Sequence, residues 1–433
     1  MLSSVLIAVG TCVLMMCCIL FFPRIKTKRV SVETYWMAAL LGAVVVVATR
    51  RIELSSLWAA LTDNSAVNPL KILLLFISMT LLSIFLDEVG FFKYLANKAL
   101  LLAGNSQVKM FTVLYWTVSV LTAFTSNDIV VLTFTPFICY FAKNAHVDPK
   151  PYLVAEFVAA NTMSMLFIIG NPTNIYIATT YGVGFVDYFL VMALPTLASA
   201  VVSFGVLYLL FRKSLRNPVF ATPEEVRVKD KPLLVLGLVV LVLATALLVV
   251  GPYFGVNMWL VAISAVGALF VLVLVFSLCR RRPPVELGRT LKRAPWSLIP
   301  FVLSMFVIIL ALKENGVTDK IGAALGSNGT VWKYGALSLL SANLINNIPM
   351  SVLFCPIVGT LPQGEVMRGV YATVAGSNIG AFLTPIGALA GIMWMSLLKR
   401  HDVKMHYVDF VKYGAAVAIP SLAACLGVLT LLL

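Results

Sequence analysis

Long uncharged runs of apolar residues alternate along the chain with short segments that carry most of the charge. Residues 2–22, 188–211 and 413–433 hold no charged side chain, and each run is long enough for one helix across a bilayer. Residues 232–279 are also uncharged and are divided by "GPYFGVN", which predicts two spans and a tight turn. The pattern predicts an all-α polytopic membrane protein.

Composition supports a membrane protein, and the distribution of charge predicts how the chain is oriented across the membrane. The 433 residues are 61% hydrophobic and 12% charged, which is too apolar for water-soluble domains. The net charge of +14 does not indicate a nucleic-acid partner, because 24 of the 32 Lys and Arg residues fall in six loops that share one side of the predicted bundle. The positive-inside rule predicts that these loops face the cytoplasm and that both termini lie on the outer side of the membrane. The membrane is expected to be the cell membrane, that is, the inner or plasma membrane. The loops are 23–34, 88–109, 143–150, 211–232, 280–293 and 399–404.

The first apolar run is expected to be a membrane span rather than a cleaved signal peptide. Its basic residues, in "PRIKTKR", follow the run instead of preceding it. The seven cysteines are scattered without a CxxC pair, and the three histidines pair with no cysteine cluster. The sequence therefore predicts no metal site and no cofactor.

Three weak internal similarities recur in the same order, which predicts a duplicated unit. The charged loops place the two copies in opposite directions across the membrane, an arrangement found in secondary transporters. The pairs are "SMTLLSIFLDEVG" (78–90) with "SMFVIILALKENG" (304–316), "TSNDIVVLTFTP" (125–136) with "LINNIPMSVLFCP" (344–356), and "ANTMSMLFIIG" (160–170) with "SNIGAFLTPIG" (377–387).

The repeats and the loops predict about ten transmembrane helices, two re-entrant helical hairpins and two broken helices. The first hairpin enters from the cytoplasm as 110–127 and 129–142, and the second enters from outside as 334–346 and 349–360. The first inverted repeat is predicted at 1–212, with scaffold helices at 1–66 and a hairpin-bearing transport part at 67–212. A cytoplasmic basic loop follows at 213–232. The second inverted repeat is predicted at 233–433, with scaffold helices at 233–295 and a hairpin-bearing transport part at 296–433.

Polar residues gather at the hairpin tips and in the broken helices at 161–174 and 376–387. Unpaired amides are costly in hydrocarbon, so such breaks persist where they line a site near the membrane midplane. Amides and hydroxyls coordinate a neutral hydroxylated solute, an oxyanion or Na⁺. The predicted substrate-binding residues are Ser126, Asn127, Asn161, Thr162, Asn171, Asn174, Asn346, Asn347, Ser377 and Asn378.

Two acidic residues are predicted to couple transport to protons or ions. Asp128 is the only carboxylate at a predicted hairpin tip, and an intramembrane carboxylate is a functional candidate by default. Glu156 is either a second proton site or a first-turn charge that faces the cytoplasm. A single Asn such as Asn174 has an alternative structural role, since amides also join membrane helices. Glu88 and Glu314 end predicted helices beside glycine and are expected to cap helices or to lie at helix interfaces.

A family resemblance rests on five motifs in order: "LDEVGFF", "NDIVVLTFTP", "RAPW", "NNIP" and "TPIGALAGIMW". Together they resemble the arsenite permease family of the ion transporter superfamily. The resemblance implies export of arsenite or antimonite, in exchange for protons or energised by a separate ATPase subunit docked on the cytoplasmic loops. Where those permeases carry acidic residues, this chain has Asn161 and Asn378.

Three alternatives stay open at this point. Within the same superfamily, the chain is alternatively a Na⁺-coupled anion transporter or a Na⁺/H⁺ antiporter. An ion channel would need a repeated selectivity ring, which nothing in the sequence resembles. An enzyme is disfavoured because no carboxylate pair or Ser/His pairing lies at membrane depth, and no GxxxxGK[ST] motif occurs in the chain.

Overall fold

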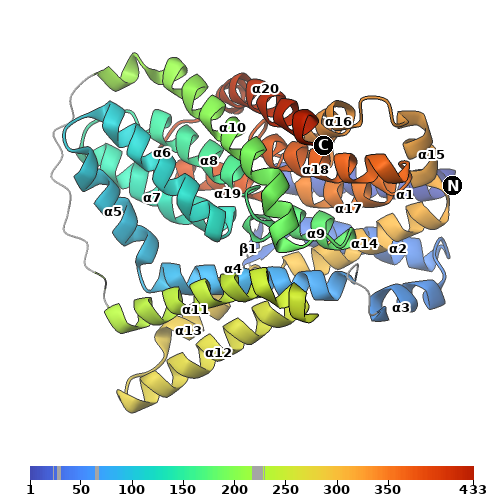
Figure 1. Ribbon diagram of the computed structural model, residues 1–433, viewed down its shortest axis with the longest axis horizontal. Helices are drawn as coiled ribbons and strands as arrows, with labels where there is room; N and C mark the ends of the chain where they lie inside the picture. The colour runs from blue at the N-terminus through green and yellow to red at the C-terminus, as the bar shows by residue number, and fades with distance from the viewer. Residues whose placement is uncertain (23, 27–30, 64–67, 217–227, 229) are drawn as a thin grey trace.

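The computed structural model shows a helical protein with one short β-hairpin (Figure 1). It describes residues 1–22, 24–26, 31–63, 68–216, 228 and 230–433. In this described part, seven helices are long and apolar enough to cross a membrane. Most of the predicted basic loop at 213–232 lies outside the described residues. The predicted all-α polytopic membrane fold is confirmed.

The first half begins with two helices joined by the β-hairpin and ends with the longest helix of the described chain. Strands β1 (Arg24–Lys26) and β2 (Ser31–Glu33) pair antiparallel, with Arg24 opposite Glu33. The helices are α1 (Leu2–Phe21), α2 (Tyr35–Ala48), α3 (Leu54–Thr62), α4 (Pro69–Glu88), α5 (Phe91–Ala103), α6 (Gln107–Phe124), α7 (Asn127–Asn144), α8 (Lys150–Met163), α9 (Pro172–Thr180) and α10 (Phe185–Phe211).

The second half repeats the order of α4 to α10 in α14 to α20. Each series has a long helix, a short helix, a helical hairpin, an interrupted helix and a final long helix. This common order agrees with the predicted pairing of the two halves, and their inversion remains a prediction. The helices are α11 (Lys231–Val250), α12 (Met258–Cys279), α13 (Val285–Arg293), α14 (Leu298–Glu314), α15 (Val317–Leu325), α16 (Thr330–Ile345), α17 (Asn347–Val358), α18 (Gln363–Gly380), α19 (Leu389–Arg400) and α20 (Tyr407–Leu432).

Equivalent glycines turn the chain after the first long helix of each series. Gly90 follows α4 with φ of 90°, and Gly316 follows α14 with φ of 67°. These left-handed values favour glycine because it has no Cβ. As predicted, Glu88 and Glu314 are the last residues of the two helices. The weak sequence similarity at 78–90 and 304–316 therefore corresponds to the same turn in both halves.

Two segments predicted as loops, 88–109 and 280–293, contain the helices α5 and α13. In α13, Leu287 and Thr290 are buried whereas Arg289 and Lys292 are exposed. Such short amphipathic helices lie along a membrane surface, and their charges hide them from a search for long apolar runs. The loop prediction was wrong for these segments, although the charge count that placed them at the surface is unaffected.

Both predicted hairpins are present with shifted turns. The first turn lies at Thr125 and Ser126, so Asp128 falls in the first turn of α7 rather than at the turn itself. In the second hairpin only Asn346 separates α16 from α17, and Pro349 lies inside the first turn of α17. Proline is tolerated there because the amide hydrogens of a first helical turn have no partner within the helix.

The hairpins and the interrupted helices form a group that we call the hairpin unit (α6 to α9 and α16 to α19). The last helices of the two series, α10 and α20, pack against each other beside it (Figure 1). On the other side, α4 packs on α11 and α12, while α14 packs on α1 and α2. Helices α4 and α14 therefore form the seam against which the hairpin arms α7 and α17 pack.

Candidate functional site

Each half contains one interrupted helix, and a glycine closes each interruption. The chain leaves helical geometry between α8 and α9 and again between α18 and α19. A Cβ on Gly170 would lie 2.2 Å from the carbonyl oxygen of Ser164, and one on Gly387 would lie 2.3 Å from that of Gly380. Only glycine fits such a close backbone approach. The two predicted helix breaks are confirmed, and their glycines have the same function in both halves.

Asn378 fastens the two interruptions to each other. Its side-chain oxygen accepts hydrogen bonds from Ser164 Oγ at 2.8 Å and Asn171 Nδ2 at 2.9 Å. Its amide nitrogen donates to Asn174 Oδ1 at 2.6 Å and to the carbonyl oxygen of Val374 at 2.9 Å. Both donors and both acceptor positions of the amide are thus in use. In this conformation Asn378 joins the two halves and has no free hydrogen-bonding position for a substrate.

Asn171 and Asn174, which were also predicted to bind substrate, serve the same junction. Asn171 Oδ1 accepts from the backbone nitrogen of Thr173 at 3.1 Å and caps α9. Asn174 Nδ2 donates to the carbonyl oxygen of Ser164 at 2.8 Å. Residues that were predicted as one set of ligands therefore separate into those that hold the backbone and those that keep a free polar atom.

Asn161 connects α8 to the tip of the first hairpin. Asn127 Nδ2 donates to Asn161 Oδ1 at 3.0 Å, and Asn161 Nδ2 donates to the carbonyl oxygen of Phe157 at 2.8 Å. Asn161 lies near the C-terminal end of α8, whereas Asn127 is the first residue of α7. The junction therefore brings the amide hydrogens of one helix end close to the carbonyl oxygens of another.

Four predicted site residues keep a buried oxygen that has no hydrogen-bond partner among the described residues. Such an atom costs about 1–3 kcal/mol unless a ligand or water satisfies it. Thr373 Oγ1 shares this property and lies one helical turn before Ser377 on α18. The sequence analysis missed Thr373, although its i, i+4 spacing from Ser377 was a usable signal. The four atoms are Ser126 Oγ, Asn127 Oδ1, Thr162 Oγ1 and Ser377 Oγ.

The second hairpin tip is strained and tightly held. Asn346 has φ of 73° and ψ of 152°, a region that residues other than glycine rarely adopt. Its Nδ2 donates to the carbonyl oxygen of Ile386 at 3.1 Å, and the backbone nitrogen of Asn347 donates to that of Gly387 at 3.0 Å. The tip of this hairpin is therefore fastened to the interruption between α18 and α19.

The two candidate carboxylates lie in different surroundings. Asp128 is half-buried and forms no hydrogen bond or ion pair with the described residues. Glu156 is 1% exposed and accepts hydrogen bonds from Thr135 Oγ1 at 3.0 and 3.1 Å. Because α8 begins at Lys150 and Glu156 is buried, the alternative of a first-turn charge facing the cytoplasm is wrong. Within the described residues no group of three or more His, Cys, Asp or Glu side chains is placed to hold a metal ion.

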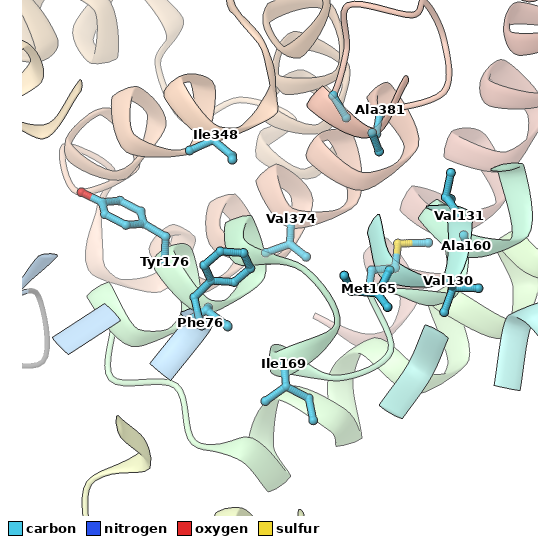
Figure 2. Packing of buried hydrophobic residues seen from close by; sticks show 14 of the residues in the cluster. Phe76, Val130, Val131, Ala160, Met165, Ile169, Tyr176, Ile348, Val374 and Ala381 are labelled. Atoms are coloured by element: carbon cyan, nitrogen blue, oxygen red, sulfur yellow. The ribbon is translucent and has the colours of Figure 1, made fainter. Parts of the chain in front are cut away.

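The seam between the hairpin unit and the flanking helices is closed on the side of the second hairpin. Helices α4, α9, α14 and α17 line a small pocket of about 20 Å³ there. This volume holds one water molecule and no larger solute. Figure 2 shows three of its lining side chains, Phe76, Tyr176 and Ile348, which come from three of these helices.

Comparison with known proteins places this architecture among membrane transporters. The sequence model of the citrate transporter family (CitMHS) matches residues 25–371. The chain belongs to this family. The match covers both hairpins and the first half of α18, and with them most of the residues of the candidate site; Ser377 and Asn378 lie beyond it.

Relatives of this family member extend the similarity over most of the chain. It is 28% identical to the arsenical pump membrane protein of Escherichia coli K12 over 374 residues, which cover 82% of this chain and 85% of the relative. A second arsenical pump membrane protein of E. coli is 26% identical over 420 residues, or 91% of this chain and 92% of the relative. An uncharacterized transporter of Mycobacterium tuberculosis is 26% identical over 367 residues, or 81% and 83%.

The fold is also found in a solved structure. The crystal structure of the Alcanivorax borkumensis YdaH transporter, described as having an unusual topology, matches with a TM-score of 0.56 and 13% identity. The match covers 99% of this chain and 97% of that one. The predicted membership of the ion transporter superfamily and the resemblance to arsenical pump proteins are confirmed, and this family member is a multi-pass membrane transporter.

Proposed function

We propose that this protein is a secondary active transporter that exports arsenite or antimonite from the cytoplasm in exchange for protons. The observation that carries the proposal is the set of buried, unpartnered oxygens on Ser126, Asn127, Thr162 and Ser377. Arsenite and antimonite are neutral trihydroxy solutes near pH 7, and their hydroxyl groups both donate and accept hydrogen bonds. A site of amides and hydroxyls suits such a solute.

The predicted ligands are all uncharged, which favours a neutral substrate further. No Lys, Arg or His occurs among the described residues of the hairpin tips and helix interruptions (125–128, 161–174, 343–350 and 376–388). A tricarboxylate such as citrate would meet the carboxylate of Asp128 without a basic side chain to balance its charge. In this reading Asp128 alternates between its protonated and ionised forms, and Glu156 is a second proton site.

A direct test compares cells that express the chain with cells carrying an empty vector. Expression is expected to lower the cellular content of arsenite and antimonite. In everted membrane vesicles, an interior made acidic is expected to drive arsenite uptake without sodium. Equal metalloid content in both strains, together with vesicles that do not respond to the pH gradient, would refute the proposed function.

The family description supports one alternative, a Na⁺-coupled anion transporter. Sodium ions bound beside the anion would supply the positive charge that the side chains lack. A Na⁺/H⁺ antiporter is the related case without an anion. Citrate uptake that requires sodium, measured in the same vesicles with no effect on metalloids, would favour the anion carrier.

The energy source is a separate part of the proposal. A proton gradient suffices for the exchange, whereas the related proposal of an ATPase subunit requires a second chain docked on the basic loops. The exposed side chains of Arg289 and Lys292 on α13 suit an acidic docking surface. Arsenite export that persists in vesicles containing only this chain, without ATP, would exclude an obligatory ATPase partner.

A further inference from the structure

A short hydrogen-bonded chain connects the β-hairpin with the start of α14. The hydroxyl of Tyr35 lies 2.9 Å from Ser297 Oγ, and Ser297 Oγ donates to Glu33 Oε2 at 2.8 Å. Ser297 lies 262 residues after Tyr35 in the sequence, so the fold brings the two together. Glu33 in turn pairs with Arg24 across the two strands at 3.2 Å, where both side chains are partly exposed. The chain therefore runs from a buried tyrosine to the protein surface.

The hydrogen bonds in this chain share one direction. A serine hydroxyl has a single hydrogen, and that of Ser297 points to the Glu33 carboxylate. With Ser297 donating to Glu33, the hydrogen between Tyr35 and Ser297 is supplied by Tyr35, whose hydroxyl also interacts with Glu33 directly. Every donor thus points toward Glu33. A proton that enters at Tyr35 can leave at Glu33 when each hydroxyl passes its own hydrogen forward.

Asp128 belongs to the electrostatic surroundings of the buried end of this chain. It is close enough to the Tyr35 hydroxyl to interact with it electrostatically, and no direct hydrogen bond joins them. Asp128 is half-buried, and the relay inferred below takes one water molecule as the link between the two groups. The tyrosine ring is held in place edge-on against Phe301, with ring centroids 5.0 Å apart.

We infer that Tyr35, Ser297 and Glu33 form a proton relay that connects Asp128 with the face carrying the basic loops. This inference rests on the proposed function, because it assumes that Asp128 exchanges protons. The O–H bond of protonated Asp128 breaks toward water, the water passes a proton to Tyr35, Tyr35 passes its hydrogen to Ser297, and Ser297 passes its own to Glu33. One proton moves, and no other reactant is needed.

The charges around Asp128 leave it without a positive partner among the described residues. Arg293 lies 2.7 Å from Asp87 and 2.5 Å from Glu88, so the acidic end of α4 has a cation of its own. Thr133 of α7 donates to Asp87, and Thr135 donates to Glu156 of α8. The lysines of α5 and α6, which also pack on α7, are exposed; they are Lys93, Lys98 and Lys109.

The relay is tested by separating proton flux from substrate movement. The purified full-length protein is placed in liposomes that contain a pH-sensitive dye. Net arsenite transport with proton counterflow is compared with arsenite–antimonite exchange at equal pH, which needs no proton release. Tyr35→Phe and Ser297→Ala are expected to slow proton-coupled flux about tenfold and leave exchange unchanged. Tyr334→Phe is the matched control, since its buried hydroxyl has no hydrogen-bond partner in the described structure.

Each outcome supports or overturns a definite statement. Proton flux at the wild-type rate in both Tyr35→Phe and Ser297→Ala would overturn the relay while the proposed function stands. Exchange that falls together with proton flux in both variants would also overturn it, because the residues would then serve the structure or substrate binding. A wild-type protein that moves arsenite without protons would instead refute the proposed exchange itself.

Discussion

The two helical hairpins share an outline and differ at their tips. In the α6–α7 hairpin the turn residues have ordinary extended backbone angles, and the half-buried Asp128 follows at once. In the α16–α17 hairpin the turn is the single strained residue Asn346, and the following residues Asn347 to Met350 are buried and uncharged. One tip is therefore charged and partly accessible, whereas the other is neutral and enclosed.

This difference suggests a division of work between the halves. The second tip is fastened by hydrogen bonds to Ile386 and Gly387 and closes its side of the seam. The first tip has one such link, from Asn127 to Asn161, and leaves its carboxylate unpaired. We therefore expect proton exchange at the first hairpin, whereas the second hairpin is held in place by its hydrogen bonds in this conformation.

The largest expected effect comes from removing the charge of the first tip. Asp128→Asn keeps the shape of the side chain and cannot exchange a proton, so transport driven by a pH gradient is expected to fall at least about 100-fold. Uptake of arsenite by everted vesicles measures this loss. Asp148→Asn, in an exposed loop, is the matched control and should transport normally. Normal gradient-driven uptake by Asp128→Asn would contradict the role in proton exchange proposed for the first tip.

A second prediction separates two neighbouring residues of α18. Asn378→Ala removes four hydrogen bonds from a buried junction and leaves the side chains of Asn171 and Asn174 without this partner, so it is expected to destabilise the fold by about 2–4 kcal/mol. Ser377→Ala removes a hydroxyl without a partner and should leave stability unchanged while weakening substrate binding. Thermal unfolding in detergent and arsenite affinity measure the two effects. If Ser377→Ala lowered stability and Asn378→Ala lowered only arsenite affinity, Ser377 would be the structural residue and Asn378 the binding residue.

The smallest effect concerns the strain at the second tip. Asn346→Ala keeps the unfavourable φ and loses two side-chain hydrogen bonds, which costs about 2 kcal/mol. Asn346→Gly loses the same bonds but relieves about 1 kcal/mol or more of strain, so the glycine variant should be the more stable of the two. Thermal unfolding of both proteins gives the difference. Equal stabilities would mean that the turn relaxes without strain.

Much of the fold was predictable because its signals are local. Charged loops and polar interruptions located both hairpins and both broken helices. The similarity of 160–170 to 377–387 also paired Gly170 with Gly387, which make equivalent close contacts. Turn positions were less accurate: the second arm of the second hairpin was predicted to begin at residue 349, whereas α17 begins at Asn347 and holds Pro349 in its first turn. The amphipathic helices α5 and α13 were missed because their charged faces hide short apolar stripes.

The roles of the asparagines were not predictable from the sequence. Asn161 and Asn378 occupy matching positions in the repeats, yet Asn161 holds a hairpin tip and Asn378 joins the two interruptions. One partner of Asn378 is Ser164, which directly follows α8 and lies 214 residues away in the chain. Which amide is saturated depends on such distant contacts, whereas sequence reasoning detects only that an amide is present in an apolar segment.

The ion pair of Arg293 with Asp87 and Glu88 has a consequence for how the protein is made. Glu88 precedes its partner by 205 residues. At a synthesis rate of about 5–20 residues per second, roughly 10 to 40 s pass between the appearance of the two. During that interval the acidic end of α4 must remain in contact with water or lipid headgroups. The negative charges at the end of α4 therefore gain their ion-pair partner only after synthesis of the second half of the chain has reached Arg293.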